Sequence, residues 1–300
     1  MKPIVQVEGF TKFYGSNKVI DNISFEIYPG EIFALLGPNG AGKTSTLECI
    51  EGIRKATAGK LRVSDLNPEK DFKKIRKRLG VQLQASALPD IITVEEAMKM
   101  FCLYLGNETR YDLLERFDLK SMCNTEFCKL STGQQRKLIL AIALAHHPEL
   151  LILDEPTAGL DVHTRVELHE IMREERAKGT AILLASHDMS EVEELADRVA
   201  ILVKGRIVAE GTPNEIITSG DSNVKIYVKT LKDALSDIKL ERAQATSEGY
   251  VVFDTEDIED TVGLILSHIK SKGDKLMDLR IERPSLEERF INITRNGGIQ

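Results

Sequence analysis

The sequence is poor in cysteine and has no long hydrophobic run, and both shortages narrow the classes of protein that it can encode. Its four cysteines lack the paired C-x-x-C spacing of a zinc or thioredoxin-like site, which indicates buried or unreactive thiols. The most apolar stretch, Leu138 to Ala145, is far shorter than the roughly 20 residues that span a bilayer. The first ten residues lack the apolar segment of a secretory signal. We therefore expect a cytoplasmic chain that does not cross a membrane by itself.

An excess of basic residues is also missing. The 40 Lys and Arg residues against 47 Asp and Glu residues give a net charge of -7 and a pI near 5.6. Such a chain has no general cationic surface for nucleic acid or an anionic bilayer. The basic run Lys73 to Arg78 is short and lacks interleaved aromatic residues, which favours a solvated helix face over a nucleic-acid patch. No nucleic-acid partner is expected.

Three short apolar runs have the continuity of strands buried on both faces, and polar residues follow each of them directly. These runs are Ile32 to Leu36, Leu150 to Leu153 and Ala181 to Ala185. In an open parallel sheet, ligands bind in the crevice beyond the carboxyl ends of the strands. The sequence therefore predicts an α/β fold in which the three polar ends face one site.

The length of 300 residues suffices for one large and one small domain. Apolar residues recur at helical spacing between about 88 and 148, which indicates an inserted helical subdomain. The segment 218–223 is rich in residues that favour turns and is a candidate linker. Strand-like and helix-like stretches then alternate. We predict a large domain at 1–217, a linker at 218–223 and a small α/β domain at 224–300.

Residues 37–44 fit the phosphate-binding motif G-x-x-x-x-G-K-[ST], between a predicted strand and a predicted helix as the motif requires. Backbone N–H groups of such a loop surround a β-phosphate, and the helix N-terminus adds positive potential. Lys43 can reach the β and γ oxygens, and Thr44 offers a hydroxyl to Mg²⁺. The helix is expected to bury Leu47, Ile50 and Ile53, which recur every three residues. The predicted nucleotide-binding residues are Gly37, Pro38, Asn39, Gly40, Ala41, Gly42, Lys43, Thr44 and Ser45.

Two carboxylates follow the second apolar run. Asp154 can hold Mg²⁺ through water, and Glu155 can accept a proton from an attacking water, a role worth about 10² to 10⁴ in rate. Acidic residues at a strand end are more often caps or solvated turns. The phosphate loop in the same sequence favours the functional interpretation. We predict Asp154 as a metal ligand and Glu155 as the general base.

A further motif makes the sequence resemble the ATP-binding cassette (ABC) ATPases. Residues 130–134 read LSTGQ, similar to the LSGGQ signature of that family, with Thr132 in place of a glycine. Ser131 is also a candidate helix N-cap and Gly133 leaves an accessible N–H, so this helix start can bind an anion. By the resemblance, Ser131, Gly133 and Gln134 contact the ATP of a partner subunit.

Four single residues match positions of the family one by one. Tyr14 is similar to the aromatic residue that stacks on adenine, although packing is the commoner role of a lone tyrosine. Gln84 resembles the Q-loop glutamine that meets Mg²⁺ and signals to a membrane partner, with Gln82 as the alternative register. Asp161 resembles the D-loop aspartate. His187 resembles the switch histidine at the γ-phosphate; a lone histidine is usually structural, but this one follows the third apolar run.

The resemblance covers about residues 4–217 and implies the fold and the chemistry of a phosphate-loop NTPase. The implied fold has a mixed sheet core, an antiparallel β subdomain and an inserted helical subdomain, followed here by the small α/β domain. Each ATP, with Mg²⁺, would lie between two subunits of a homodimer or heterodimer, and Glu155, His187 and Gln84 would form the catalytic set. Residues 88–101 look like the surface that receives a transporter's coupling helix, with ordinary core packing as an equal alternative.

The tail, Arg283 to Thr294, resembles the P-S-L-E-x-x-F-x-x-L-T ending of ATPase subunits of ABC-2 type exporters, including the daunorubicin-resistance group. The implied function is ATP hydrolysis that drives export of an unidentified substrate, such as a drug, through a separate polytopic permease. The chain would then lie on the inner face of the cell membrane. Two alternatives are a soluble ABC ATPase that remodels a ribosome or a nucleic-acid complex, and an importer subunit. A second cassette, a long coiled coil and a basic surface are missing, which argues against the first, and the tail argues against the second.

Overall fold

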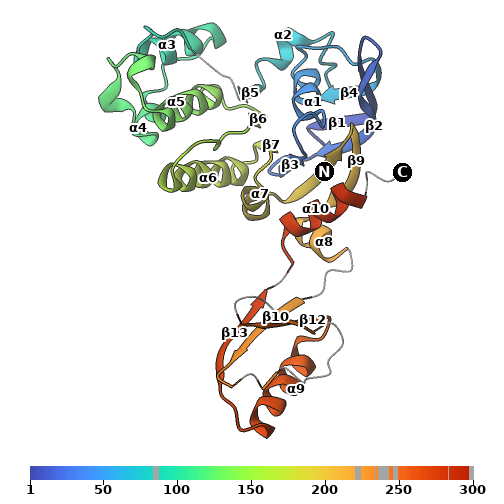
Figure 1. Ribbon diagram of the computed structural model, residues 1–300. Helices are drawn as coiled ribbons and strands as arrows, with labels where there is room; N and C mark the ends of the chain where they lie inside the picture. Colours follow the sequence, from blue (N-terminus) through green and yellow to red (C-terminus); the bar gives the residue numbers. More distant parts are fainter. Residues whose placement is uncertain are drawn as a thin grey trace. The chain divides into compact units, whose positions relative to one another are not determined.

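The computed structural model describes residues 1–83, 88–219, 224–232, 234–235, 243–245, 249–282 and 284–296. The chain divides into two compact units, Met1–Pro213 and Asn214–Ile299 (Figure 1). Residues 220–223 of the predicted linker lie outside the described residues, so the linker stays a prediction.

A six-stranded mixed sheet forms the centre of the first unit, in the order β5-β6-β7-β3-β8-β9. Its strands from β5 to β8 are parallel, and β9 is antiparallel to β8. Every residue of β3, β6 and β7 is buried, because helices or a second sheet cover both faces. The three predicted apolar runs are therefore neighbouring strands. Their bounds are β3 (Ile32–Leu36), β5 (Leu79–Gln82), β6 (Leu150–Asp154), β7 (Ala181–Ser186), β8 (Arg198–Val203) and β9 (Arg206–Gly211).

An antiparallel sheet in the order β2-β1-β4 packs on this core. It comprises β1 (Val5–Tyr14), β2 (Asn17–Ile27) and β4 (Ala58–Val63). Phe25 of β2 stacks on Phe33 of β3 with 5.1 Å between ring centroids, so the two sheets share one apolar layer. Helix α1 (Lys43–Ile50) belongs to the same cluster. The prediction that Ile53 lies on its buried face was wrong: α1 ends before Gly52, which has a φ of +78°, and Ile53 is 55% exposed.

Figure 1 shows α3, α4 and α5 gathered beside the sheet. These helices are α3 (Val94–Leu105), α4 (Tyr111–Arg116) and α5 (Thr132–Leu144). Thr93 starts α3 through a reciprocal capping box with Glu96, and Gly106 ends it in the left-handed conformation. Apolar residues of the three helices form one cluster with β6 and β7. The other helices of the unit are α2 (Phe72–Ile75), α6 (Val162–Ala177), α7 (Met189–Leu195) and the 3₁₀ turns η1 (Lys120–Met122) and η2 (Phe127–Lys129).

The second unit is a four-stranded antiparallel sheet, in the order β11-β12-β10-β13, with helix α9 packed on it. Ile226 and Phe253 of the sheet meet Ile265 and Ile269 of the helix in a small core. Regular elements thus occupy the stretches whose pattern indicates a small α/β domain. Their bounds are α8 (Pro213–Thr218), β10 (Val224–Thr230), β11 (Ala243–Ala245), β12 (Val251–Thr255), α9 (Ile258–Ser271), β13 (Leu276–Glu282) and α10 (Leu286–Asn296).

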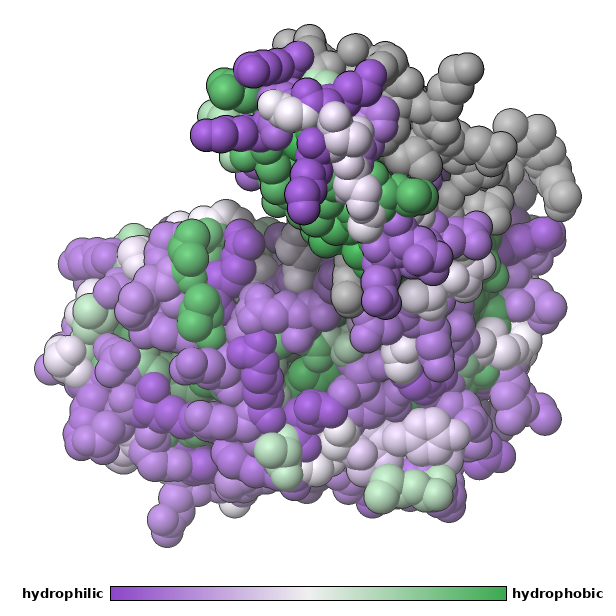
Figure 2. Space-filling model, turned by 90° about the horizontal axis from the view of Figure 1, so that it is seen from below, coloured by the Kyte–Doolittle hydropathy of each residue, from purple (hydrophilic) through white to green (hydrophobic). Residues whose placement is uncertain are grey.

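The helices are short or polar by the standard of membrane-spanning segments. Among the described residues, none of the helices combines the length and the apolar character needed to span a bilayer. The face in Figure 2 is mainly hydrophilic, and its hydrophobic residues stand in small separate groups. Four of the basic side chains between Lys73 and Arg78 are exposed, on and after the four-residue helix α2.

Candidate active site

The carboxyl ends of β3 and β6, together with the loop after β7, open onto a polar pocket of about 230 Å³. The fold brings together most of the residues predicted for nucleotide binding and catalysis, and it adds Val19 of β2, to which the sequence pattern gave no role. The lining residues are Val19, Pro38, Asn39, Gly40, Gly42, Lys43, Thr44, Ser45, Asp154, Glu155 and His187. Two residues of the predicted loop, Gly37 and Ala41, do not line the pocket, and the side chain of Ala41 is buried in the core.

Glycine is required along the phosphate loop because neighbouring elements approach its backbone closely. A Cβ on Gly37 would lie 2.4 Å from the carbonyl oxygen of Leu202. Gly42, the N-cap of α1, has a φ of +107°, and a Cβ there would lie 2.3 Å from Cδ1 of Ile20. The loop can therefore keep its path only without side chains at these positions.

Gly42→Ala should weaken nucleotide binding at least about tenfold, because a left-handed φ costs a non-glycine residue about 1 kcal/mol or more and the clash with Ile20 displaces the loop. Titration of a fluorescent ATP analogue measures the effect. Gly106→Ala is the matched control, since Gly106 has a φ of +79° and a Cβ there would have no atom of the described structure within 4 Å. Equal affinity of the two variants would contradict the role given to the loop path.

The side chain of Lys43 is held inside the phosphate loop. Its Nζ donates to the carbonyl oxygen of Gly37 at 2.5 Å and lies 3.5 Å from that of Pro38. Burial lowers the pKa of Lys43, while Glu155 and Asp154 act in the opposite direction. The ammonium group is thus fixed where the oxygens of a bound phosphate would compete for it.

Asp154 and Thr44 supply two oxygen donors on one side of the pocket. Thr44 Oγ1 donates to Asp154 Oδ2 at 3.4 Å, and Asp154 is buried at the end of β6. Burial, and then the charge of Glu155, raises the pKa of Asp154, whereas Lys43 and Thr44 lower it. Hydroxyl and carboxylate oxygens are the hard donors that suit Mg²⁺.

Glu155 and His187 form a pair at the mouth of the pocket. His187 Nδ1 lies 2.7 Å from Glu155 Oε1. The carboxyl is buried, whereas the side chain of His187 is 61% exposed. Glu155 has a φ of +52°, and its N–H donates to the carbonyl oxygen of Ala185 in β7. A non-glycine residue in this conformation is strained, and such strain concentrates at functional sites.

Tyr14 lies next to the phosphate loop at the end of β1. Its hydroxyl is 3.3 Å from Ser45 Oγ, and the residue is 36% exposed. Lys12 and Arg54 approach the ring, at 4.9 and 5.3 Å from its centroid. An exposed aromatic ring beside the loop is the arrangement that the adenine-stacking prediction requires.

The predicted signature and D-loop residues do not line this pocket. Ser131 caps α5 in a capping box. The Oγ of Ser131 accepts from the N–H of Gln134 at 3.3 Å, and the Oε1 of Gln134 accepts from the N–H of Ser131 at 2.9 Å. Asp161 caps α6 by accepting from the N–H and the hydroxyl of Thr164. Thr164 also borders Gly133, where a Cβ would lie 3.2 Å from Thr164 Cγ2. Ser131 is exposed at the start of its helix.

The glutamine predicted for the Q-loop has no position in the described structure. Gln84 lies outside the described residues. Gln82, its register alternative, is fully buried in β5 opposite Leu153, and its amide has no hydrogen-bond partner among the residues that the structure describes. Both assignments stay predictions.

A buried hydrogen-bond network joins the segments that carry Glu155 and His187, and no sequence motif indicates it. Glu191 of α7 accepts from the hydroxyls of Thr157 at 2.6 Å and Ser186 at 2.8 Å. His169 Nε2 of α6 lies 3.4 Å from the same carboxyl, which is almost completely buried. Thr157 follows Glu155 by two residues and Ser186 precedes His187. Glu191 therefore ties together the two segments that carry the pair.

Glu191→Ala should destabilise the first unit by about 3 kcal/mol, because it leaves the hydroxyls of Thr157 and Ser186 buried without their acceptor. It should also slow ATP hydrolysis at temperatures where the variant is folded, since the loops that carry Glu155 and His187 lose their common support. Thermal unfolding and steady-state hydrolysis measure both effects. Glu170→Gln, at an exposed position of α6, is the control. Unchanged hydrolysis by the folded variant would assign the network to stability alone.

Comparison with known proteins identifies the family of the chain. The family model described as ABC transporter matches residues 20–158. The chain is 35% identical over 305 residues to Nod factor export ATP-binding protein I of Paraburkholderia xenovorans (strain LB400), covering 97% of this chain and 96% of that protein. It is 31% identical to Linearmycin resistance ATP-binding protein LnrL of Bacillus subtilis (strain 168), covering 97% and 98%.

A solved structure described as the ATP binding subunit of an ABC transporter superposes with a TM-score of 0.68 at 29% identity, covering 72% of this chain and 92% of that one. These likenesses confirm the predicted fold class and the predicted ATPase activity. The sequence motifs, the polar pocket and the relatives lead to one assignment. The chain belongs to the ABC transporter family, as an ATPase subunit of the ABC-2 exporter type.

Proposed function

We propose that this chain binds ATP with Mg²⁺ at an interface between two ATPase subunits, hydrolyses it with Glu155 as the general base, and so drives export through a separate membrane permease. The observation that carries the catalytic part is the pair of Glu155 and His187, 2.7 Å apart at the pocket that the phosphate loop lines. A buried carboxylate oriented by a histidine can accept the proton of an attacking water.

The binding part of the proposal rests on the phosphate loop. The backbone of residues 37–42 and the ammonium of Lys43 hold the phosphates, at the N-terminus of α1. Thr44 and Asp154 would hold Mg²⁺, which when bound neutralises charge on the phosphate oxygens. Tyr14 would stack on the adenine. Gln84 is proposed as a further contact to the metal and the water.

The proposed dimer is supported by the position of the predicted signature residues. Ser131, Gly133 and Gln134 begin a 13-residue helix whose first turn is accessible, yet they do not line the pocket of their own chain. A helix N-terminus of this kind attracts phosphate. We propose that it completes the site of a second ATPase subunit, identical or different, with Asp161 at the same interface.

The export part is supported by the relatives, one named for Nod factor export and one for linearmycin resistance. Such a subunit works at the inner face of the cell membrane, held by its permease. We propose that the permease contacts the groove between α3 and the strand β5, where residues 88–101 meet the core. The cargo would touch the permease and not this chain.

Purification of the tagged chain from gently solubilised native membranes tests the proposal. A multispanning protein recovered in about equal amount is the expected result, as a stable complex of subunits requires. Ribosomal or nucleic-acid-bound partners without a membrane protein would overturn the export function and leave the ATPase activity untouched. Uptake of a substrate by the reconstituted complex would show an importer instead.

A further inference from the structure

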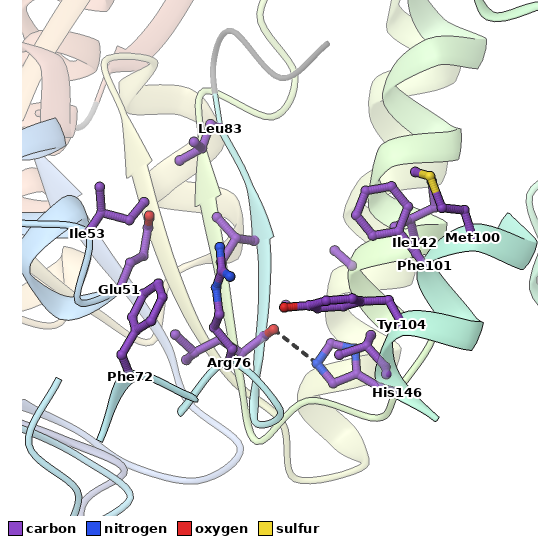
Figure 3. A pocket seen from close by; sticks show the side chains of 15 residues that line it. Glu51, Ile53, Phe72, Arg76, Leu83, Met100, Phe101, Tyr104, Ile142 and His146 are labelled. Carbon is purple, nitrogen blue, oxygen red and sulfur yellow. Dashed lines mark hydrogen bonds between the residues drawn. The ribbon is translucent and has the colours of Figure 1, made fainter. Parts of the chain in front are cut away.

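A second, larger cavity lies in the first unit, away from the nucleotide pocket. It is an apolar groove of about 540 Å³, formed by the end of α1, helix α2, strand β5 and the helices α3 and α5. Figure 3 shows Glu51, Phe72 and Arg76 on one side of it and Met100, Phe101 and Tyr104 on the other. We refer to this cavity as the apolar groove.

Large hydrophobic side chains at the rim of the apolar groove are exposed to solvent. Ile53 is 55% exposed, Met100 46% and Tyr104 71%, and all three line the groove. Leu103, next to it on α3, is 80% exposed. A partner that covers such side chains removes their apolar surface from water, which stabilises the complex. Clustered exposure of this kind marks a protein contact surface.

Glu51 is the unexpected member of this apolar lining. It is the residue after α1, it is only 3% exposed, and neither of its carboxyl oxygens has a hydrogen-bond partner among the described residues. Burial, helped by the charges of Glu48 and Asp154, raises the pKa of Glu51 to about 7. A buried carboxyl without a hydrogen-bond partner makes folding less favourable than an apolar side chain of the same size would.

The other titratable groups of the apolar groove do not satisfy Glu51. Arg76 stacks on Phe72, with its guanidinium 4.4 Å from the ring centroid, and no hydrogen bond joins it to Glu51 in the described structure. His146 Nε2 lies 3.0 Å from the carbonyl oxygen of Leu79, and burial lowers its pKa. Tyr104 extends from the opposite helix. A proton donor or a cation for Glu51 must therefore come from outside these groups.

We propose that Glu51 pairs with a basic side chain on the permease segment that occupies the apolar groove. The inference rests on the proposed function and adds the chemistry of the contact: an amphipathic segment with an apolar face and one Arg or Lys within it. Charge complementarity selects this occupant. A cation would stabilise the buried, unpartnered carboxyl of Glu51 strongly. An anion would stabilise Arg76 less, because that side chain is exposed and already solvated.

Fluorescein-labelled amphipathic helical peptides test the pairing with the full-length chain. The peptides share one Leu- and Phe-rich face and differ in a single central residue, which is Arg, Lys, Gln or Glu. Anisotropy titrations at pH 8 should give about tenfold tighter binding for the Arg and Lys peptides than for the Gln peptide. At pH 6 this preference should shrink, because the pKa of Glu51, raised by burial to about 7, leaves more of its carboxyl protonated at that pH.

Three variants distinguish the charge pairing of Glu51 from the apolar contacts of the groove and from effects on folding. Glu51→Gln should remove the preference for Arg and Lys while it still binds the peptides, and its affinity for a fluorescent ATP analogue should not change. Met100→Ser should weaken all four peptides alike, because it removes apolar contacts from the wall without adding a charge. Glu170→Gln should behave as the wild type.

Each other outcome counts against a definite part of the proposal. Equal binding of the Arg and Gln peptides, with loss in Met100→Ser, would overturn the pairing and leave the groove as the permease contact. Preference for the Glu peptide would assign the contact to Arg76. Absence of saturable binding by any peptide would overturn both, whereas the ATPase proposal would stand on its own hydrolysis assay.

Discussion

Glu155→Gln is expected to lower the turnover of ATP hydrolysis by about 10² to 10⁴, with ATP affinity nearly unchanged. Glutamine keeps the size of the side chain and an oxygen that can face His187, now 2.7 Å away, but its amide cannot accept the proton of water. The loss therefore falls on the chemical step and spares binding by the loop and Lys43. Single-turnover hydrolysis and titration of a fluorescent ATP analogue measure the two separately.

The variant should also accumulate a dimer in ATP, because the nucleotide that closes two subunits is no longer hydrolysed. Size-exclusion chromatography with and without ATP detects it. Glu170→Gln carries the same substitution at an exposed position of α6 and should turn over normally. Repeated turnover by purified Glu155→Gln would show that another group accepts the proton.

The sheet and the pocket could be predicted from the sequence because their signals are local. A strand buried on both faces needs a continuous apolar run, and β3, β6 and β7 each have one. The loop at 37–44 combines glycine, lysine and threonine at fixed spacing, so its contacts to phosphate follow from the order of residues. The parallel arrangement of three strands then brings Asp154, Glu155 and His187 to that loop.

The parts that sequence reasoning missed depend on contacts between distant segments. Nothing near Glu191 indicates that Thr157 and Ser186 would donate to it, because α7 meets the ends of β6 and β7 only in the fold. Periodicity placed Ile53 on a buried face, since spacing alone does not show that Gly52 ends α1. Glu51 stands beside Ile50 with no local mark of its burial, because α2 and β5, which line the same groove, come next to it only in the fold.

Lys43→Ala is expected to weaken ATP binding by about 100-fold. The ammonium makes charge-assisted hydrogen bonds to phosphate oxygens, and two such bonds contribute about 1.5 kcal/mol or more each. The Nζ of Lys43 donates to the carbonyl oxygen of Gly37 and lies near that of Pro38, so the ammonium group is already inside the loop. Alanine leaves the loop glycines in place, so the backbone N–H groups alone hold the phosphates.

The substitution should not unfold the chain, and this separates a binding defect from a folding defect. Burial already lowers the pKa of Lys43, which means that the folded protein bears a cost for the charge that alanine removes. The melting temperature without nucleotide should therefore stay the same or rise, while the increase that ATP gives the wild type disappears. Lys60→Ala, at an exposed position of β4, should keep that increase. Full ATP stabilisation of Lys43→Ala would mean that backbone groups and Mg²⁺ ligands suffice for binding, and that Lys43 acts on the γ-phosphate only during hydrolysis.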